Sequence, residues 1–119
     1  MSTIKVDTIK NTSNVEVFTA KAWVNFDGTG TVAIRASGNV SSIVDNGTGY
    51  YTVNFTTAMT DANYSAVANA TSNFTGSWNR VVTCGDSAIP TTTSIRLRTN
   101  RADTTTYDDC EYITLAIFR

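Results

Sequence analysis

Histidine is absent from this chain of 119 residues, and its absence limits the chemistry that the side chains can support. Ser-His-Asp catalysis, Cys-His catalysis and every His-ligated metal site are excluded. Paired carboxylates remain as candidates for hydrolysis. Cleavage of a glycosidic bond needs one carboxyl group in an apolar pocket that raises its pKa. The acidic candidates lie instead in and beside one Thr-rich loop: Asp103, Asp108, Asp109 and Glu111.

Nothing in that polar loop indicates an apolar pocket, so we interpret these residues as solvated acids. The loop also lacks the spaced ligand pattern of a known calcium loop. Cys84 and Cys110 do not have metal-type spacing. The sequence therefore predicts no catalytic residues, no metal site, no cofactor and no enzyme activity. The two cysteines are interpreted as buried, reduced side chains, and a disulfide between neighbouring strands is the alternative.

Recognition chemistry is better represented than catalytic chemistry. Trp78 closes the loop 71–78 and is followed by Asn79 and Arg80, which places a rigid ring beside an amide and a guanidinium. The loop 99–109 adds Tyr107 and Asp108. We expect these five residues to make any receptor contact, because recognition concentrates on loops held by a rigid scaffold. For Trp78 itself, a role as a core anchor is an equal alternative.

The composition indicates strands as the elements that position these loops. Thr, Asn, Ser and Val dominate, and leucine occurs only at Leu97 and Leu115. Short alternating segments recur at spacings of about ten residues, which is typical of a sandwich or a barrel. The expected strands include 40–44, 64–70, 78–84 and 94–100. In the segment after the turn 27–30, Val32 and Ile34 are expected to point inward, and 57–63 is the one candidate for a helical turn.

The chain divides into a polar N-terminal arm, residues 1–19, and one domain, residues 20–119. The arm contains a short alternating segment at 3–9, which we expect to form a strand, followed by a polar turn at 11–14. It is too short to fold alone.

The last strand, 110–118, is apolar on both faces. Ile113, Leu115 and Ile117 share one face, and Phe118 lies on the other. A strand of this kind is buried on both sides, either as a central strand under a sheet and a loop or at a subunit interface. We predict an oligomer interface that includes these four residues.

The charge pattern excludes some partners. The formal net charge is −1, and the basic residues are scattered, so the chain has no basic footprint for nucleic acid. No apolar run approaches the length of a membrane span, and the N-terminus has no apolar signal region. We therefore expect that the protein is made in a cytoplasm and does not insert into a membrane.

Two stretches of the first half carry a resemblance to a known family. They are Lys21-Ala-Trp-Val-Asn-Phe-Asp-Gly-Thr-Gly30 and Asp45-Asn-Gly-Thr-Gly-Tyr-Tyr-Thr-Val-Asn-Phe55. The sequence of these two stretches resembles a domain of tail-fibre and other virion structural proteins of tailed phages, in particular phages of cyanobacteria and other aquatic bacteria. The resemblance covers roughly the first half of the chain.

The resemblance implies an antiparallel β-sandwich, jelly-roll-like, that forms a homotrimer in the tail of a virion. The protein would be a short tail fibre or its distal module, attached to other tail or baseplate proteins and presenting loops to a host-surface glycan. The arm would be the attachment or intertwining segment, and the protein would be made in the host cytoplasm. A capsid decoration or cement protein is the alternative, and a carbohydrate-active enzyme is disfavoured by the missing catalytic residues.

Overall fold

The computed structural model of the protein describes residues 3–72, 79–85 and 88–119. Within these residues the chain forms eight strands and no helix. None of the described residues therefore belongs to a helix that is long and apolar enough to span a bilayer. The strands are β1 (Ala22–Asp27), β2 (Ala33–Gly38), β3 (Val40–Gly47), β4 (Tyr50–Phe55), β5 (Ser65–Thr71), β6 (Arg80–Cys84), β7 (Ser94–Arg101) and β8 (Tyr112–Phe118).

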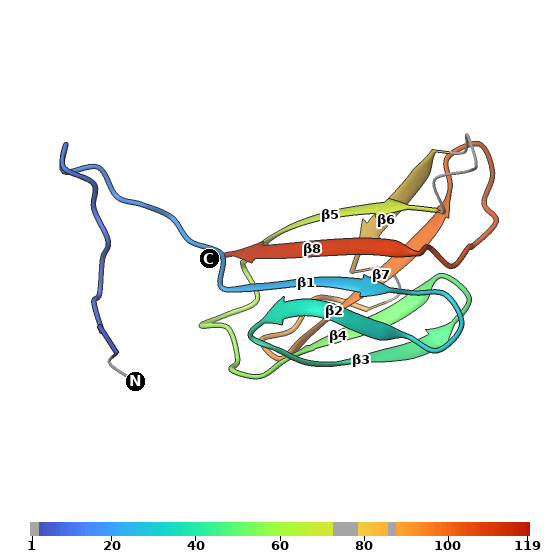
Figure 1. Ribbon diagram of the computed structural model, residues 1–119, viewed down its shortest axis with the longest axis horizontal. Helices are drawn as coiled ribbons and strands as arrows, with labels where there is room; N and C mark the ends of the chain where they lie inside the picture. The colour runs from blue at the N-terminus through green and yellow to red at the C-terminus, as the bar shows by residue number, and fades with distance from the viewer. Residues whose placement is uncertain (1–2, 73–78, 86–87) are drawn as a thin grey trace.

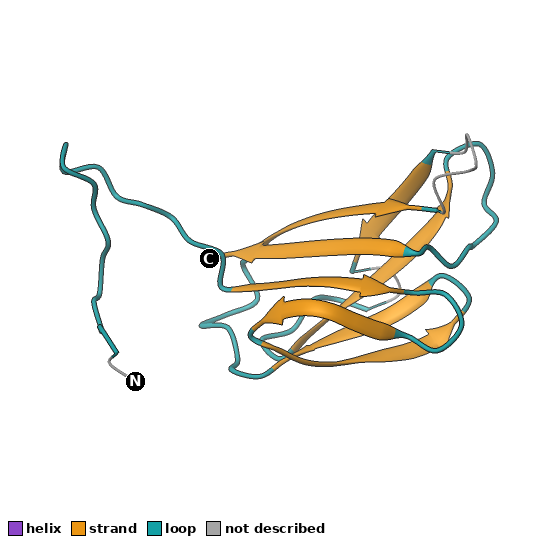
Figure 2. Cartoon of the chain, viewed as in Figure 1, coloured by secondary structure: helices purple, strands orange, loops and turns teal. Residues whose placement is uncertain are grey.

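The strands form two four-stranded sheets, in the orders β2-β1-β8-β5 and β3-β4-β7-β6. All strand pairs are antiparallel, and Figure 1 shows the two sheets packed over each other. The pairs β1–β2, β3–β4 and β6–β7 are hairpins within one sheet, and Figure 2 shows the loops that connect the strands at the two ends. The all-β antiparallel sandwich predicted above is confirmed. Its jelly-roll-like detail is not confirmed by this strand order and stays a prediction.

The core lies between the sheets and follows from alternation along the strands. β4 buries every second side chain from Tyr51 to Phe55, and β7 does the same from Ile95 to Thr99. Phe26 of β1 and Tyr51 of β4 meet edge to face across the sandwich, with ring centroids 5.3 Å apart. Each large apolar side chain buried in this way stabilises the fold by about 1.5–3 kcal/mol.

β8 lies between β1 and β5, which corrects most of the predicted oligomer interface. Ile113, Leu115 and Ile117 are at most 3% exposed within a single chain, because they point between the sheets. They are core residues and are not available to a second subunit. Phe118 lies on the opposite face of the strand and remains 39% exposed, so the interface prediction stands for this residue alone.

The outer face of the β2-β1-β8-β5 sheet is partly covered by long side chains. A Cβ atom at Gly38 would overlap the Trp23 indole, so the ring lies directly over this glycine on the neighbouring strand. The Arg35 guanidinium lies 3.9 Å from the centroid of the Tyr112 ring. Ile34 pairs with the buried Phe26 and so faces inward as expected, but β2 is an edge strand and leaves this side chain 39% exposed.

The segment 57–63 forms bends instead of the predicted helical turn. Its backbone groups bond to distant residues. Thr57 N donates to Asn39 Oδ1, Thr57 O accepts from Asn39 Nδ2, and Met59 N donates to Thr92 O. Burial of Met59 in the core adds to these long-range bonds, and together they outweigh local helix formation.

Residues 3–20 have exposed side chains and run away from the sandwich, as Figure 1 shows at the blue end of the chain. The predicted strand at 3–9 is absent. The segment instead turns back at residues 11–14, and an isolated bridge joins Lys10 to Glu16. Below we call residues 3–19 the arm.

Both cysteines are free thiols. Cys110 is fully buried, and Cys84 is half-buried. Burial raises the pKa of each thiol above its ordinary value, which keeps both protonated at neutral pH. This agrees with the interpretation of reduced, buried side chains.

Candidate functional site

The two loop regions predicted to carry recognition meet at one end of the sandwich. Ala102 N donates a hydrogen bond of 3.0 Å to Asn79 O, and Arg80 of β6 pairs with Arg101 of β7. Trp78 lies outside the described residues. In Figure 1 the loop that follows β7 lies at the end opposite to the arm. The loop 101–109 and the arm are therefore at opposite ends of the molecule (Figure 1).

The loop 101–109 folds back along β7 and is held there by its own backbone. Asp108 N donates to Thr99 O at 3.2 Å, and the Thr99 hydroxyl donates to Asp108 O at 2.5 Å. Tyr107 forms an isolated bridge with Asn100. This pairing places Tyr107 on the outer face of the β3-β4-β7-β6 sheet, next to the side chain of Arg98.

The Arg98 guanidinium lies between two aromatic rings. It is 4.3 Å from the centroid of Tyr107 and 4.8 Å from that of Tyr50, which pairs with Arg98 across β4 and β7. Such a cation–ring contact contributes about 0.5–1 kcal/mol at an exposed site. Tyr107 remains 43% exposed, so one part of its ring is fixed by Arg98 while another part faces solvent. We call Tyr50, Arg98 and Tyr107 the stacked cluster.

Arg80 and Asp108 form an ion pair of 2.8 Å, and the Arg80 side chain is only 5% exposed. The Asp108 carboxylate also lies 3.5 Å from Arg101 Nε. Arg80 is therefore corrected from a receptor contact to a residue that positions the loop. Asp108 is 30% exposed and shares its charge with both arginines, so its main contacts are within the protein.

Asp109 is also tied into the fold, which corrects its interpretation as a solvated acid. Its Oδ1 accepts hydrogen bonds of 2.7 Å from Gly49 N and from the Tyr51 hydroxyl. Burial, together with the neighbouring Asp109 carboxylate, raises the pKa of Tyr51 well above its ordinary value, so the hydroxyl remains a donor. Sequence reasoning missed this contact. The sequence feature that could have indicated this contact is Gly49. Its φ of 65° and its missing side chain let the loop 101–109 approach closely.

A shallow groove lies beside these residues, lined by Thr29, Ser72, Arg80, Asp108, Asp109 and Glu111. In the described part of the chain, no group of three or more Cys, Asp or Glu side chains is placed to hold a metal ion. Two of the carboxylates that face the groove, those of Asp108 and Asp109, are engaged by arginine, tyrosine and backbone donors. The arrangement suits hydrogen bonding to a polar ligand and the stacking of a ring on Tyr107.

Four of the predicted receptor residues are described by the structure, and two of these four are exposed, Asn79 and Tyr107. Arg80 and Asp108 hold the loop in place. The stacked cluster adds Tyr50 and Arg98, which the sequence analysis did not single out. The signal for them was the alternation of β4 and β7, which points Tyr50 and Arg98 to the same outer face.

Comparison of the chain with protein-family models, with curated proteins and with solved structures finds no match. The resemblance to phage virion proteins therefore stands on the quoted residues alone.

Proposed function

We propose that this protein is a non-catalytic virion structural protein of a tailed phage, a short trimeric tail fibre or its distal module that attaches to a host-surface glycan. The observation that carries the proposal is the exposed Tyr107 ring, fixed on Arg98 and held on a loop at the end of a rigid sandwich. Recognition sites are commonly built from such loops. Rigid aromatic residues serve as anchors at low entropic cost.

The bipolar layout supports the same proposal. Residues 101–109 lie at one end, and the arm and both chain termini lie toward the other (Figure 1). A fibre module needs one end to join the virion and another end to meet the host. The residues that carry the family resemblance, 21–30 and 45–55, lie in β1, β3, β4 and the turns beside them. They form the framework, and the proposed contact residues lie on loops outside it.

A sugar ring would stack on the exposed part of the Tyr107 ring. The Asn79 side chain, which is exposed next to the same loop, would bond hydroxyl groups. Loss of a buried aromatic anchor in such a contact typically costs about 2 kcal/mol or more of binding free energy.

The proposal is tested by the binding of labelled protein to intact cyanobacterial cells and to lipopolysaccharide extracted from them. Tyr107→Ala and Asn79→Ala are expected to reduce binding, with Trp78→Ala as a third variant. Phe18→Tyr, at the arm end, serves as a control that keeps an exposed ring in place. Circular dichroism must first show an unchanged fold for each variant.

Unchanged binding by both Tyr107→Ala and Asn79→Ala would exclude these loops as the receptor site. Binding to empty phage heads, without binding to cells or lipopolysaccharide, would instead identify a capsid decoration protein. If Trp78→Ala unfolds the protein, Trp78 is a core anchor.

A further inference from the structure

The arm carries large apolar side chains that its own sandwich does not bury. These are Ile4, Val6, Ile9, Val15, Val17 and Phe18, and their exposed fractions range from 42% for Val17 to 88% for Ile4. Exposed apolar side chains are unremarkable when scattered singly, but a dense group on one segment marks an interaction surface.

The arm is nevertheless preformed. Val17 N donates to Ile9 O at 2.7 Å, and Asn11 N donates to Val15 O at 2.9 Å. The Asn11 side chain accepts bonds from the backbone within the turn, and Asn14 adopts a φ of 62°. The arm therefore doubles back on itself, and backbone hydrogen bonds join its two legs over residues 9–17. A partner would meet an ordered surface with part of the ordering cost already met.

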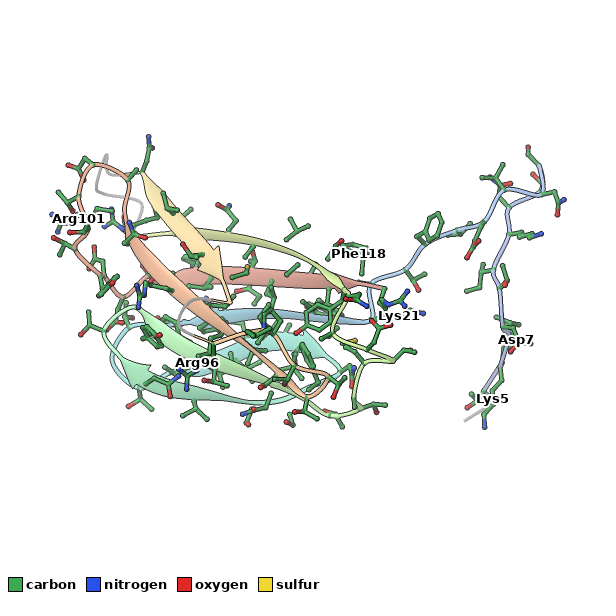
Figure 3. All side chains as sticks on the ribbon, turned by 180° about the vertical axis from the view of Figure 1, so that it is seen from behind. Lys5, Asp7, Lys21, Arg96, Arg101 and Phe118 are labelled. Carbon is green, nitrogen blue, oxygen red and sulfur yellow. The ribbon has the colours of Figure 1, made fainter. Side chains whose placement is uncertain are left out.

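A groove separates the arm from the end of the sandwich. On one side lie residues 6–9 and 16–19, which we call the arm wall. On the other side lie Lys21, Asn63, Ser65, Phe118 and Arg119, which we call the body wall. Figure 3 shows Lys21 and Phe118 together at the end of the sandwich, with Asp7 well away from them on the arm.

The two walls complement each other in charge and in polarity. The arm wall holds two acids, Asp7 and Glu16, and no base, whereas the body wall holds Lys21 and Arg119 and no acid. Arg119 is also bonded to Asp61 at 2.7 Å, so Lys21 is the main cation of the body wall. Each wall also has apolar side chains, Phe18 on the arm and Phe118 on the body.

We propose that the arm wall of one copy seats on the body wall of a second copy of this chain. Within one chain an open groove keeps the two walls apart and leaves the apolar side chains of the arm exposed, and a second copy would bury them. Because the two surfaces differ, the contact is head to tail, and it closes a ring when the rotation between successive copies brings the last arm back to the first body. This inference rests on the proposed function, since a ring of three copies is the trimeric fibre module suggested there.

The first test is the mass of the full chain by light scattering at micromolar concentrations. An oligomer is expected for the parent. Phe18→Asp is expected to give a monomer, because a charged side chain replaces the ring that would be buried against Phe118 of the second copy. Val15→Asp is the matched control, since Val15 is exposed on the same arm but lies outside the arm wall. A monomeric parent, or equal loss of association in both variants, would overturn the proposal.

Charge reversal tests the pairing of the walls. Lys21→Glu is expected to weaken association at least tenfold, and adding Asp7→Lys in the same chain is expected to restore much of it. Failure of the second change to restore association would count against the charge complementarity of the two walls.

Mixing tests the head-to-tail geometry. Phe18→Asp spoils the arm wall and Phe118→Ser spoils the body wall, so each variant alone is expected to be monomeric. A mixture of the two retains one intact arm wall and one intact body wall, and a heterodimer is expected. A mixture that stays monomeric would reject arm exchange.

Cell binding separates this inference from the proposed function. An oligomer that behaves as expected but binds no host cells or lipopolysaccharide rejects attachment and leaves arm exchange supported. A monomer that still binds cells overturns arm exchange and leaves attachment in place.

Discussion

The Tyr51 hydroxyl donates a hydrogen bond of 2.7 Å to the Asp109 carboxylate, which joins the interior of the sandwich to the loop that presents Tyr107. Tyr51 is fully buried on β4, and Asp109 lies just before β8. The same carboxylate oxygen accepts a bond from Gly49 N. Asp109 therefore ties the loop to the core, in addition to the contacts that Asp108 makes with Arg80 and Thr99.

Replacing Tyr51 by Phe removes this bond without changing the shape of the ring. A hydrogen bond to a charged group contributes about 1.5–3 kcal/mol, so we expect the free energy of unfolding in urea to fall by that amount. Tyr107→Phe is the control, because its side chain is 43% exposed, and it should change stability by less than about 0.5 kcal/mol. Equal stability of the two variants would contradict the role given to the Tyr51 hydroxyl.

The same burial predicts a loss of stability at alkaline pH. The pKa values of Tyr51 and Cys110 are raised above their ordinary values, mainly by burial. Above about pH 9 the unfolded chain releases these protons while the folded chain keeps them. The unfolded state then binds fewer protons, so stability falls as pH rises. Urea midpoints measured across this range should decline, and the slope should be shallower for Tyr51→Phe. A midpoint that does not move would contradict this.

The ion pair between Arg80 and Asp108 should matter far more for stability than its neighbour. Arg80→Met removes a side chain that is 5% exposed and leaves the 30% exposed Asp108 carboxylate with a weaker partner, which we expect to cost about 1.5–3 kcal/mol. Arg101→Met is the matched control, since Arg101 pairs with the same carboxylate but is 40% exposed, and its loss should cost at most about 1 kcal/mol. Chemical denaturation of both variants decides the point, and similar losses would reject the assignment of Arg80 as a positioning residue.

The sandwich class could be predicted from the sequence because alternation is strict where one face of a strand is buried. β4 and β7 show this pattern throughout, and β7 lies where a strand was expected at 94–100. β8 was expected to be buried on both sides. It is central, but its outer face, which includes Phe118, is open to solvent within one chain. Apolar residues on two faces do not reveal which face meets the partner sheet.

The errors share a physical cause, which is contact between residues far apart in the sequence. Ile34 has the inward direction that its pattern predicts, but the edge position of β2 leaves it half-exposed, which the pattern does not show. The segment 57–63 has local helical character, but long-range bonds to Asn39 outweigh it. Likewise, Asp109 resembles any loop acid until folding brings Gly49 and Tyr51 to it. Composition and periodicity contain no information about these long-range contacts.

The burial of Ile117 within one chain predicts how its truncation behaves. Ile117 is fully buried between the sheets, so Ile117→Ala should cost about 2–5 kcal/mol through lost apolar burial and an unfilled cavity. The loss should be the same at every protein concentration, because the residue belongs to the core of a single chain. Thr114→Ala, at an exposed position of the same strand, serves as the control. A destabilisation that vanishes at high protein concentration would return Ile117 to a subunit interface.

Alanine variants of Gly49 and Gly30 distinguish the effect of backbone strain from the effect of displacing the loop 101–109. Both have positive φ, 65° and 57°, so alanine at either position is strained by about 1–2 kcal/mol. At Gly30 a Cβ atom would meet nothing within 4 Å, whereas at Gly49 it would lie 2.5 Å from Thr99 O and 2.9 Å from Asp108 N. Gly49→Ala must therefore displace the loop, at a further cost of about 1–3 kcal/mol.

Displacement of the loop would also disturb Tyr107, which follows the same backbone pairing. We therefore expect Gly49→Ala to lose both stability and binding to host cells, while Gly30→Ala loses only stability. Urea unfolding measures the first effect, and the cell-binding assay, run well below the unfolding transition, measures the second. Full binding by a folded Gly49→Ala protein would show that recognition does not depend on where this loop places Tyr107.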